Sequence, residues 1–224
     1  MKKESKNQQR ERMAKIVERL EGIYPDAVCA LEYDGEPWKL MVMARLSAQC
    51  TDARVNIVCR DLFARFPTLD SLADADIEDI EDIVRPCGLF RTKAKSIKEA
   101  CADVRDIHGG KVPDNMDDLL KLSGVGRKIA NLLLGDIYGK PAIVADTHCI
   151  RICGRFGMYD TALKDPHKVE RILSDIVEPE KQSDFCHRIV QFGRDTCMAR
   201  SPRCDVCPLS DLCPYQKEKP TKSI

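Results

Sequence analysis

The sequence has little that suggests a membrane or secreted protein. Among its 224 residues, no apolar run approaches the roughly 18 residues that a transmembrane helix needs. Residues 1–13, MKKESKNQQRERM, are charged but lack the apolar segment of a secretory signal. Hydrophobic residues make up 43% and charged residues 32%, which is typical of a soluble globular protein. We therefore expect a cytoplasmic protein that does not contact membranes.

The sequence also has no net charge, because its 36 basic residues equal its 36 acidic ones in number. This balance gives no support to nucleic-acid binding and counts mildly against it. The charges are segregated, however. Residues 67–83 hold seven acidic side chains and no basic one, whereas residues 187–224 hold seven Lys or Arg against four Asp or Glu. A neutral protein can still present one basic face to phosphates.

Signals for β-strands are few, and most apolar residues recur at helical spacing. Among the acidic residues of 67–83, apolar residues from Leu69 to Ile83 recur at helical spacing and form one stripe. The acidic side chains are therefore expected to form the solvated face of a helix. The pattern predicts an all-α protein. The other expected helical segments cover residues 12–20, 38–46, 55–66, 93–104, 116–122, 127–138, 166–177 and 183–192.

Twelve cysteines are many for a chain without an export signal. Eight are scattered among apolar neighbours, where we expect most of them to be small buried side chains. The last four crowd into 17 residues and predict a metal site. These four are Cys197, Cys204, Cys207 and Cys213.

The gaps between these four cysteines are six, two and five residues. Zinc sites usually come as two tight pairs, so this spacing favours an iron–sulfur cluster while leaving zinc open. Four cysteines fill a tetrahedral shell, which indicates a structural site. Arg200 and Arg203 lie in the first gap, where a pinned loop can hold guanidinium groups toward phosphates or simply leave them solvated.

Residues 122–131 read LSGVGRKIAN and lie between two expected helices. Gly124 and Gly126, with Val125 between them, permit a tight turn whose φ angles would strain other residues. Such a turn leaves backbone N–H groups at the start of the next helix, where an anion is favoured. A DNA phosphate fits there without sequence preference, so the segment predicts a helix–hairpin–helix.

Lys128 falls in the first turn of the second hairpin helix. The helix dipole disfavours positive charge there, which favours a neutral amine that can act as a nucleophile. Asp146 follows an apolar run and precedes Thr147 and His148. The alternatives are ordinary ones: a solvated lysine, an aspartate that caps a helix, and a structural histidine.

Together these motifs resemble the endonuclease III family of helix–hairpin–helix DNA glycosylases. The resemblance rests on LSGVGRKIAN, VADTH, the four cysteines, LSAQCTDARVN (46–56) and GLFRTKA (88–94), and it extends over residues 24–213. It implies two helical domains that flank a DNA-binding cleft. Residues 30–140 would form a six-helix barrel with the hairpin, and residues 1–29 with 141–224 a domain that holds a [4Fe-4S] cluster.

The resemblance also implies an activity, that of a bifunctional DNA glycosylase and abasic-site lyase. The enzyme would flip an oxidised pyrimidine out of duplex DNA. Lys128 would then attack C1′, and Asp146 would help activate the lysine and stabilise charge on the sugar. The Schiff base permits β-elimination 3′ to the lesion or to an existing abasic site. We expect a monomer.

Further residues match the family by position. Gln49 and Leu89 would fill the vacated stack and wedge the opposite strand. Gly124, Val125, Gly126, Arg200 and Arg203 would contact the DNA backbone. Ser123 departs from the pattern, since the family hairpin often has proline there, and we expect a less rigid turn.

Three other functions compete with this hypothesis. An adenine-mismatch glycosylase also carries such a cluster, but generally lacks the hairpin lysine and adds a C-terminal domain. A non-catalytic DNA-binding module would not need Lys128 and Asp146. A redox protein would need other signals, such as a dinucleotide-binding fingerprint, which we do not find.

Overall fold

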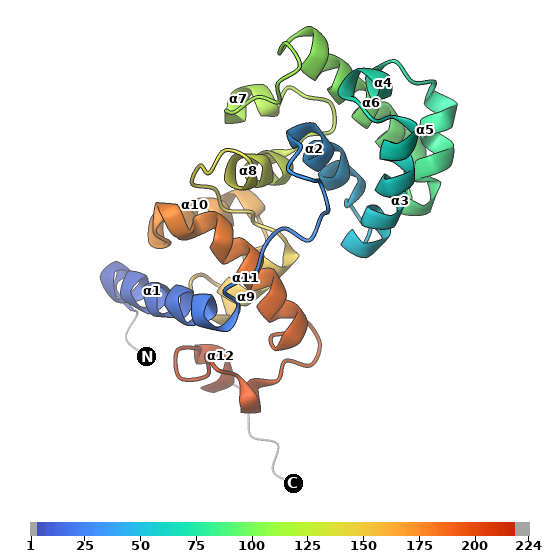
Figure 1. Cartoon of the computed structure of the whole chain (residues 1–224). Coiled ribbons are helices and arrows are strands. Elements are labelled where there is room, and N and C mark those ends of the chain that lie inside the picture. Colours follow the sequence, from blue (N-terminus) through green and yellow to red (C-terminus); the bar gives the residue numbers. More distant parts are fainter. Residues whose placement is uncertain (1–3, 218–224) are drawn as a thin grey trace. The chain divides into compact units, whose positions relative to one another are not determined.

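The computed structural model describes residues 4–217, and every regular element among them is a helix (Figure 1). None of these helices combines the length and apolarity needed to cross a bilayer. The all-α prediction is confirmed. The chain divides into two compact units, one formed by Cys29–Gly139 and the other by Met1–Val28 with Lys140–Ile224.

The first unit is built around helix α2 (Pro37–Leu46). Seven of its ten residues are buried, so the helix is apolar on nearly every side and belongs inside the unit. Helices α3 (Asp52–Arg65), α6 (Phe90–Asp106) and α8 (Arg127–Asp136) pack against it. The short helix α7 (Met116–Leu119) packs on α8, and a tight turn joins the two.

The acidic segment forms two helices instead of one continuous stripe. Helices α4 (Leu69–Ala73) and α5 (Ile77–Val84) are separated by residues 74–76, and both pack on α6. The break lies where α4 ends at its C-cap residue Asp74 and the backbone at Asp76, the N-cap residue of α5, is extended. The acids nevertheless line the solvated side, as expected: six of the seven are exposed and Glu81 is half-buried.

The second unit packs four longer helices around one core. These are α1 (Lys6–Ile23), α9 (Thr147–Arg155), α10 (Pro166–Ile176) and α11 (Gln182–Asp195). A capping box between Ser5 and Gln8 begins α1, whose apolar stripe is fully buried. Phe156 stacks on Phe192 with 6.1 Å between ring centroids at the centre of this core.

Four short helices complete the described chain: η1 (Arg85–Cys87) in the first unit, and η2 (Pro179–Lys181), η3 (Cys204–Val206) and α12 (Pro214–Lys217) in the second. Helix α9 was not among the helices that we expected, although Asp146 as a possible N-cap residue lies at its start. Six of the eight scattered cysteines are buried and two are half-buried, which confirms that most are core side chains.

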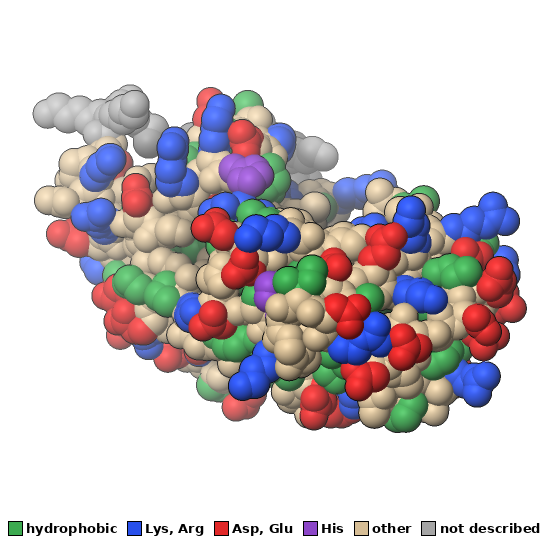
Figure 2. All heavy atoms as spheres, turned by 90° about the horizontal axis from the view of Figure 1, so that it is seen from above, with side chains coloured by type: hydrophobic (Ala, Val, Ile, Leu, Met, Phe, Trp, Pro, Cys, Tyr) green, Lys and Arg blue, Asp and Glu red, His purple; other side chains and the backbone are tan. Residues whose placement is uncertain are grey.

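Surface charge is mixed on the side drawn in Figure 2. Lys and Arg side chains alternate with Asp and Glu, and hydrophobic side chains form only small groups. This face is therefore not the basic face that the segregated charges allow.

Candidate functional site

The hairpin lies between α7 and α8, and Gly124 carries its sharpest constraint. Gly124 has a φ of +74°, a left-handed conformation that glycine adopts without strain. A Cβ atom at this position would lie 2.6 Å from Arg45 Nε and 2.8 Å from Ser96 Cβ. The glycine is therefore required twice, by its backbone angle and by the close approach of α2 and α6.

Gly126 differs from the prediction. Its φ is −92°, which any residue can adopt, and nothing lies within 4 Å of a Cβ built there. It serves instead as the N-cap residue of α8 and leaves the start of that helix uncovered. Within residues 4–217, the amide N–H groups of Gly126 and Lys128 have no hydrogen-bond partner. An anion is favoured at such a helix start.

Val125 is less suited to contact DNA. Its side chain is buried, 6% exposed, and its amide donates to the carbonyl of Leu122 at 3.1 Å. The next hairpin position, Ser123, has a contact that proline could not make, because its hydroxyl donates to Glu99 Oε2 at 2.7 Å. This bond ties the turn to α6, against our expectation that serine leaves it loose.

Lys128 occupies the first turn of α8 with its side chain exposed. The ammonium group makes no hydrogen bond or ion pair with the described residues. Lys121, seven residues earlier, is also exposed but is held by Asp118 at 2.7 Å. Among these two lysines next to the hairpin, only Lys128 has an uncommitted amine.

Asp146 belongs to the other unit and is half-buried. It is the N-cap residue of α9, and its Oδ1 accepts a 2.7 Å hydrogen bond from the amide of Cys149. The simpler alternative of a capping aspartate is thus present in the structure, and only one of the two carboxylate oxygens takes part in the cap. His148 is half-buried against α11 and lies 3.3 Å from Arg151, as a structural histidine would.

Gln49 and Leu89 share an unusual backbone. Both have left-handed φ angles, +57° and +48°, and both side chains are exposed. Outside glycine, such angles cost about 1–3 kcal/mol and gather at functional sites. Gln49 lies in the turn between α2 and α3, and Leu89 directly precedes α6, with 63% of its surface exposed. No glycine or other sequence signal marks this strain.

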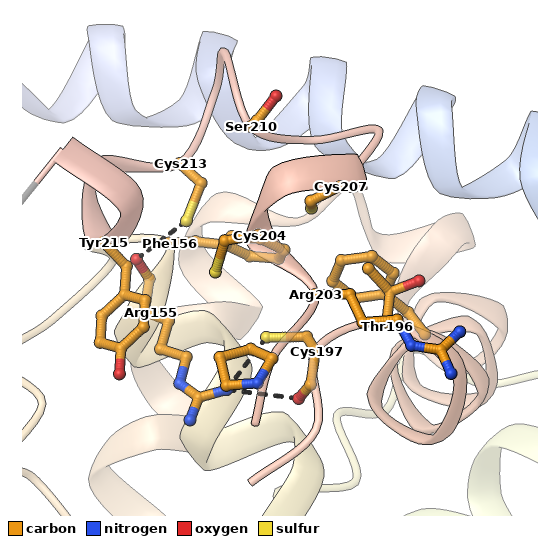
Figure 3. A pocket seen from close by; sticks show the side chains of 12 residues that line it. Arg155, Phe156, Thr196, Cys197, Arg203, Cys204, Cys207, Ser210, Cys213 and Tyr215 are labelled. Carbon is orange, nitrogen blue, oxygen red and sulfur yellow. Dashed lines mark hydrogen bonds between the residues drawn. The ribbon is translucent and has the colours of Figure 1, made fainter. Parts of the chain in front are cut away.

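The four C-terminal cysteines surround one pocket in the second unit (Figure 3). The pocket opens in part to solvent. Its lining combines the apolar residues Phe156, Phe192 and Pro202 with polar and charged ones, namely Arg155, Thr196, Arg203, Ser210 and Tyr215. Burial raises the pKa of the Cys207 thiol, and the other three cysteines raise it further. A positively charged group in the pocket would relieve this crowding of thiolates.

Four cysteine thiols that line one pocket are a donor set that suits zinc or an iron–sulfur cluster. Iron–sulfur clusters are held by cysteine thiolates, and four of them match the four ligands that a [4Fe-4S] cluster needs. The residues present therefore fit such a cluster.

Arg155, which the sequence did not single out, organises the first cysteine loop. The residue is 8% exposed, and its guanidinium donates to the carbonyls of Met198 and Ala199 at 2.7 and 2.8 Å. It also lies 3.3 Å from Cys197 Sγ and covers the ring of Tyr215 (Figure 3). A buried arginine in α9 thus replaces the hydrogen bonds that an irregular loop lacks.

Two arginines of α1 hold the rest of the loop. Arg12 donates to the carbonyl of Leu212 at 3.1 Å, and Arg19 donates to the carbonyl of Pro208 at 2.8 Å and to Asp211. These hydrogen bonds and the ion pair explain why the N-terminal helix α1 belongs to the same unit as the cysteines. Arg200 and Arg203 are exposed and have no ion-pair partner within the part of the chain that the structure describes.

Comparison with known proteins identifies the family. Residues 42–179 match the model of the HhH-GPD superfamily of base excision DNA repair proteins, and residues 197–213 match the iron-sulfur binding domain of endonuclease III. The endonuclease III of Synechocystis sp. is 40% identical over 92% of this chain and 93% of its own. That of Haemophilus influenzae is 39% identical, over 91% and 95%.

The chain belongs to the endonuclease III family. It is a DNA glycosylase and abasic-site lyase of base excision repair, and it carries a [4Fe-4S] cluster. The second matched segment begins at Cys197 and ends at Cys213. A solved non-covalent endonuclease III–DNA complex has a TM-score of 0.87 and 38% identity, covering 93% of this chain and 96% of the other. A thymine-DNA glycosylase, 20% identical with a TM-score of 0.85, shares the fold.

Proposed function

We propose that this enzyme excises oxidised pyrimidines from duplex DNA, with Lys128 as nucleophile and Asp146 as the stabilising carboxylate. The observation that carries the proposal is the state of Lys128: an exposed amine without a partner, directly after a hairpin whose amides are open to an anion. A trapped endonuclease III–DNA covalent intermediate has been solved for a protein 38% identical to this one.

In the proposed reaction, the amides at the start of α8 hold a phosphate of the damaged strand. The Lys128 amine attacks C1′, the C1′–N bond to the base breaks, and the base leaves with the bonding electrons and takes up a proton. The lysine nitrogen gives up a proton, the C1′–O4′ bond breaks as O4′ is protonated, and the opened sugar is held as an imine. The imine acidifies the proton on C2′, and its loss expels the 3′ phosphate by β-elimination. An abasic site enters the same sequence at imine formation, without base loss.

Asp146 would stabilise positive charge that develops on the sugar and the attacking amine. One of its oxygens caps α9, which fixes the carboxylate in one orientation. Such a preorganised charge typically contributes about 10²–10³ in rate. The capping role and the catalytic role are therefore compatible, and the two can be separated by mutation.

The four cysteines would hold the cluster, and Arg155 would keep the Cys197 loop closed around it. When bound, the cluster supplies a rigid anchor for the loop that carries Arg200 and Arg203, which would bind phosphates without reading bases. The eight cysteines outside the cluster site are free thiols in the described residues, which suits a reducing compartment, and we place the enzyme in the cytoplasm. We propose that it acts as a monomer.

Borohydride trapping tests the nucleophile. Lys128→Ala should abolish the covalent adduct with an abasic duplex and leave duplex binding nearly intact. Lys121→Ala is the matched control, since that lysine is exposed in the same hairpin but paired with Asp118. A Lys128→Ala protein that still forms the adduct in full yield would show that another amine is the nucleophile.

Asparagine and alanine at position 146 separate the two roles of Asp146. Asparagine caps helices as well as aspartate does, so Asp146→Asn should leave stability unchanged and slow base removal by about 10²–10³. Asp146→Ala should add a loss of about 0.5–2 kcal/mol in unfolding free energy. If Asp146→Asn removed bases at the wild-type rate, helix capping would be the only role of Asp146.

A comparison of base excision from one duplex sequence tests the substrate class. The duplexes carry thymine glycol, uracil or adenine opposite 8-oxoguanine.

A further inference from the structure

Lys93 is the most deeply buried cation of the first unit. The side chain is 1% exposed, although lysine is almost never fully buried unless its charge is paired. It lies in the first turn of α6, within the segment GLFRTKA. Its partners are not carboxylates but two main-chain carbonyls, those of Leu46 at 2.8 Å and Cys87 at 2.7 Å.

The two carbonyls end two separate elements. Leu46 is the last residue of α2, and Cys87 is the last residue of η1. The carbonyls at a helix C-terminus lack partners within the helix, and a cation there is favoured. One ammonium group therefore closes the ends of both elements and fixes them at the same point.

Each carbonyl is followed almost at once by a strained residue. Gln49 comes three residues after Leu46, and Leu89 two residues after Cys87, and both have left-handed φ angles. Strained non-glycine residues persist only where the surrounding structure over-determines them. At these two positions, the shared constraint on the preceding backbone is the Lys93 ammonium.

The surroundings of Lys93 indicate a hydrogen-bonding role and not charge neutralisation. The groups that face it are the thiols of Cys50 and Cys87 and the guanidinium of Arg45. Burial lowers the pKa of Lys93, and burial together with Cys50 raises the pKa of Cys87 to about 11, so the neighbouring thiol is neutral. The Cys50 and Cys87 thiols also contact each other, which brings the two turns together.

We propose that Lys93 is a positioning residue that holds the turns of Gln49 and Leu89 together, so that both side chains enter the DNA from one rigid edge. This inference rests on the roles of Gln49 and Leu89 in the proposed function. Lys93 does not touch the substrate. By positioning Gln49 and Leu89, it affects extrusion of the base and the contact with the opposite strand. It does not affect the chemistry at C1′.

The test compares Lys93→Met with Lys98→Met. Methionine keeps the apolar length of the side chain and removes the donors. Lys98 is the matched control, because it lies on the same helix and its ammonium also donates to a main-chain carbonyl, that of Ala75 at 2.5 Å, away from both turns. Thermal unfolding and cluster absorbance establish that each variant is folded.

Lys93→Met should lower base excision from duplex DNA by about 10- to 100-fold, since misplacement of a positioning group by about 1 Å can cost about 100-fold. Strand cleavage at an abasic site in single-stranded DNA, where there is no base to extrude and no opposite strand, should stay within about twofold of wild type. In a Gln49→Ala, Leu89→Ala background, Lys93→Met should change the duplex rate little further, because the groups that it positions are gone. Lys98→Met should behave as wild type throughout.

Equal losses on single and double strands would overturn the proposal, and so would a full additive loss in the double-alanine background. If Lys93→Met does not fold, Lys93→Gln, which keeps an amide donor, is subjected to the same measurements. Failure of both to fold beside a folded Lys98→Met would show a global stabilising role and refute the local one. Borohydride trapping with Lys128→Ala, run in parallel, shows separately whether the proposed function holds.

Discussion

Replacing Gly124 by alanine offers a sharp test of the hairpin geometry. The left-handed backbone costs a non-glycine residue about 1–2 kcal/mol. The new methyl would lie 2.8 Å from Ser96 Cβ, a contact that a rotation of the Arg45 side chain cannot relieve, and such overpacking costs about 1–3 kcal/mol. Alanine also restricts the unfolded chain, which offsets about 0.4–1 kcal/mol of this loss in unfolding free energy. The net loss should therefore be about 3 kcal/mol, within a range of about 1–5.

Gly126→Ala is the matched control two residues away. Its φ of −92° suits alanine, and the position is open. Loss of a preferred capping residue and the gain from the unfolded state should nearly cancel, leaving stability within about 1 kcal/mol of wild type. The methyl would, however, stand beside the open amides of Gly126 and Lys128, so duplex binding should weaken.

Thermal unfolding followed by far-UV circular dichroism measures the first effect. For a chain of this size, 1 kcal/mol shifts Tm by about 2–4 °C, so Gly124→Ala should melt about 6–12 °C lower. Fluorescence anisotropy with a duplex that contains an abasic-site analogue measures the second. A Gly124→Ala protein that melts within about 2 °C of wild type would refute the steric argument, as would an equal loss of stability in Gly126→Ala.

Three more predictions concern the second unit and the buried thiols. Purified protein should be brown and contain about four irons per chain, and Cys204→Ser should lower soluble yield before it affects chemistry; a colourless active protein with one zinc would contradict this. Arg200→Ala and Arg203→Ala should each weaken binding to all DNA duplexes equally, and each should lower by about one unit the slope of the logarithm of the binding constant against the logarithm of the salt concentration. An unchanged slope would exclude phosphate contacts. Cys101, with burial raising its pKa to about 12, should resist alkylation until the protein unfolds, as mass spectrometry of labelled peptides can show.

The hairpin and the cysteine site could be predicted from the sequence because each has a characteristic local pattern of residues. Glycine spacing between two apolar segments predicted the turn, and Gly124 has the left-handed backbone that was expected. For Gly126 the reason was wrong, since its backbone is ordinary and what matters is the missing side chain at a helix start. Two glycines two residues apart look alike in sequence, and only the packing of α2 and α6 around the turn distinguishes them.

Lys93 and Arg155 could not be found by the same reasoning. Helical periodicity assigns a charged residue to the solvated face, but both side chains point into irregular backbone that has unpaired carbonyls. The need for a buried cation arises only when elements distant in sequence bring those carbonyls together. For Lys93 the separation is 47 residues to Leu46, and for Arg155 it is 43 to Met198.

Helix α6 links the three features of the first unit that we propose to contact DNA. Leu89 directly precedes it, Lys93 fixes the turn of Gln49, Ser96 lies beside Gly124 of the hairpin, and Glu99 accepts a hydrogen bond from Ser123. Within the helix, positions 93, 96 and 99 follow one another at intervals of three residues, so they are neighbours on its surface. A shift of α6 along its axis would therefore move Leu89, the turn of Gln49 and the hairpin together. The serine at position 123 strengthens this coupling, because its bond to Glu99 gives the hairpin a contact with α6 that a proline would not provide.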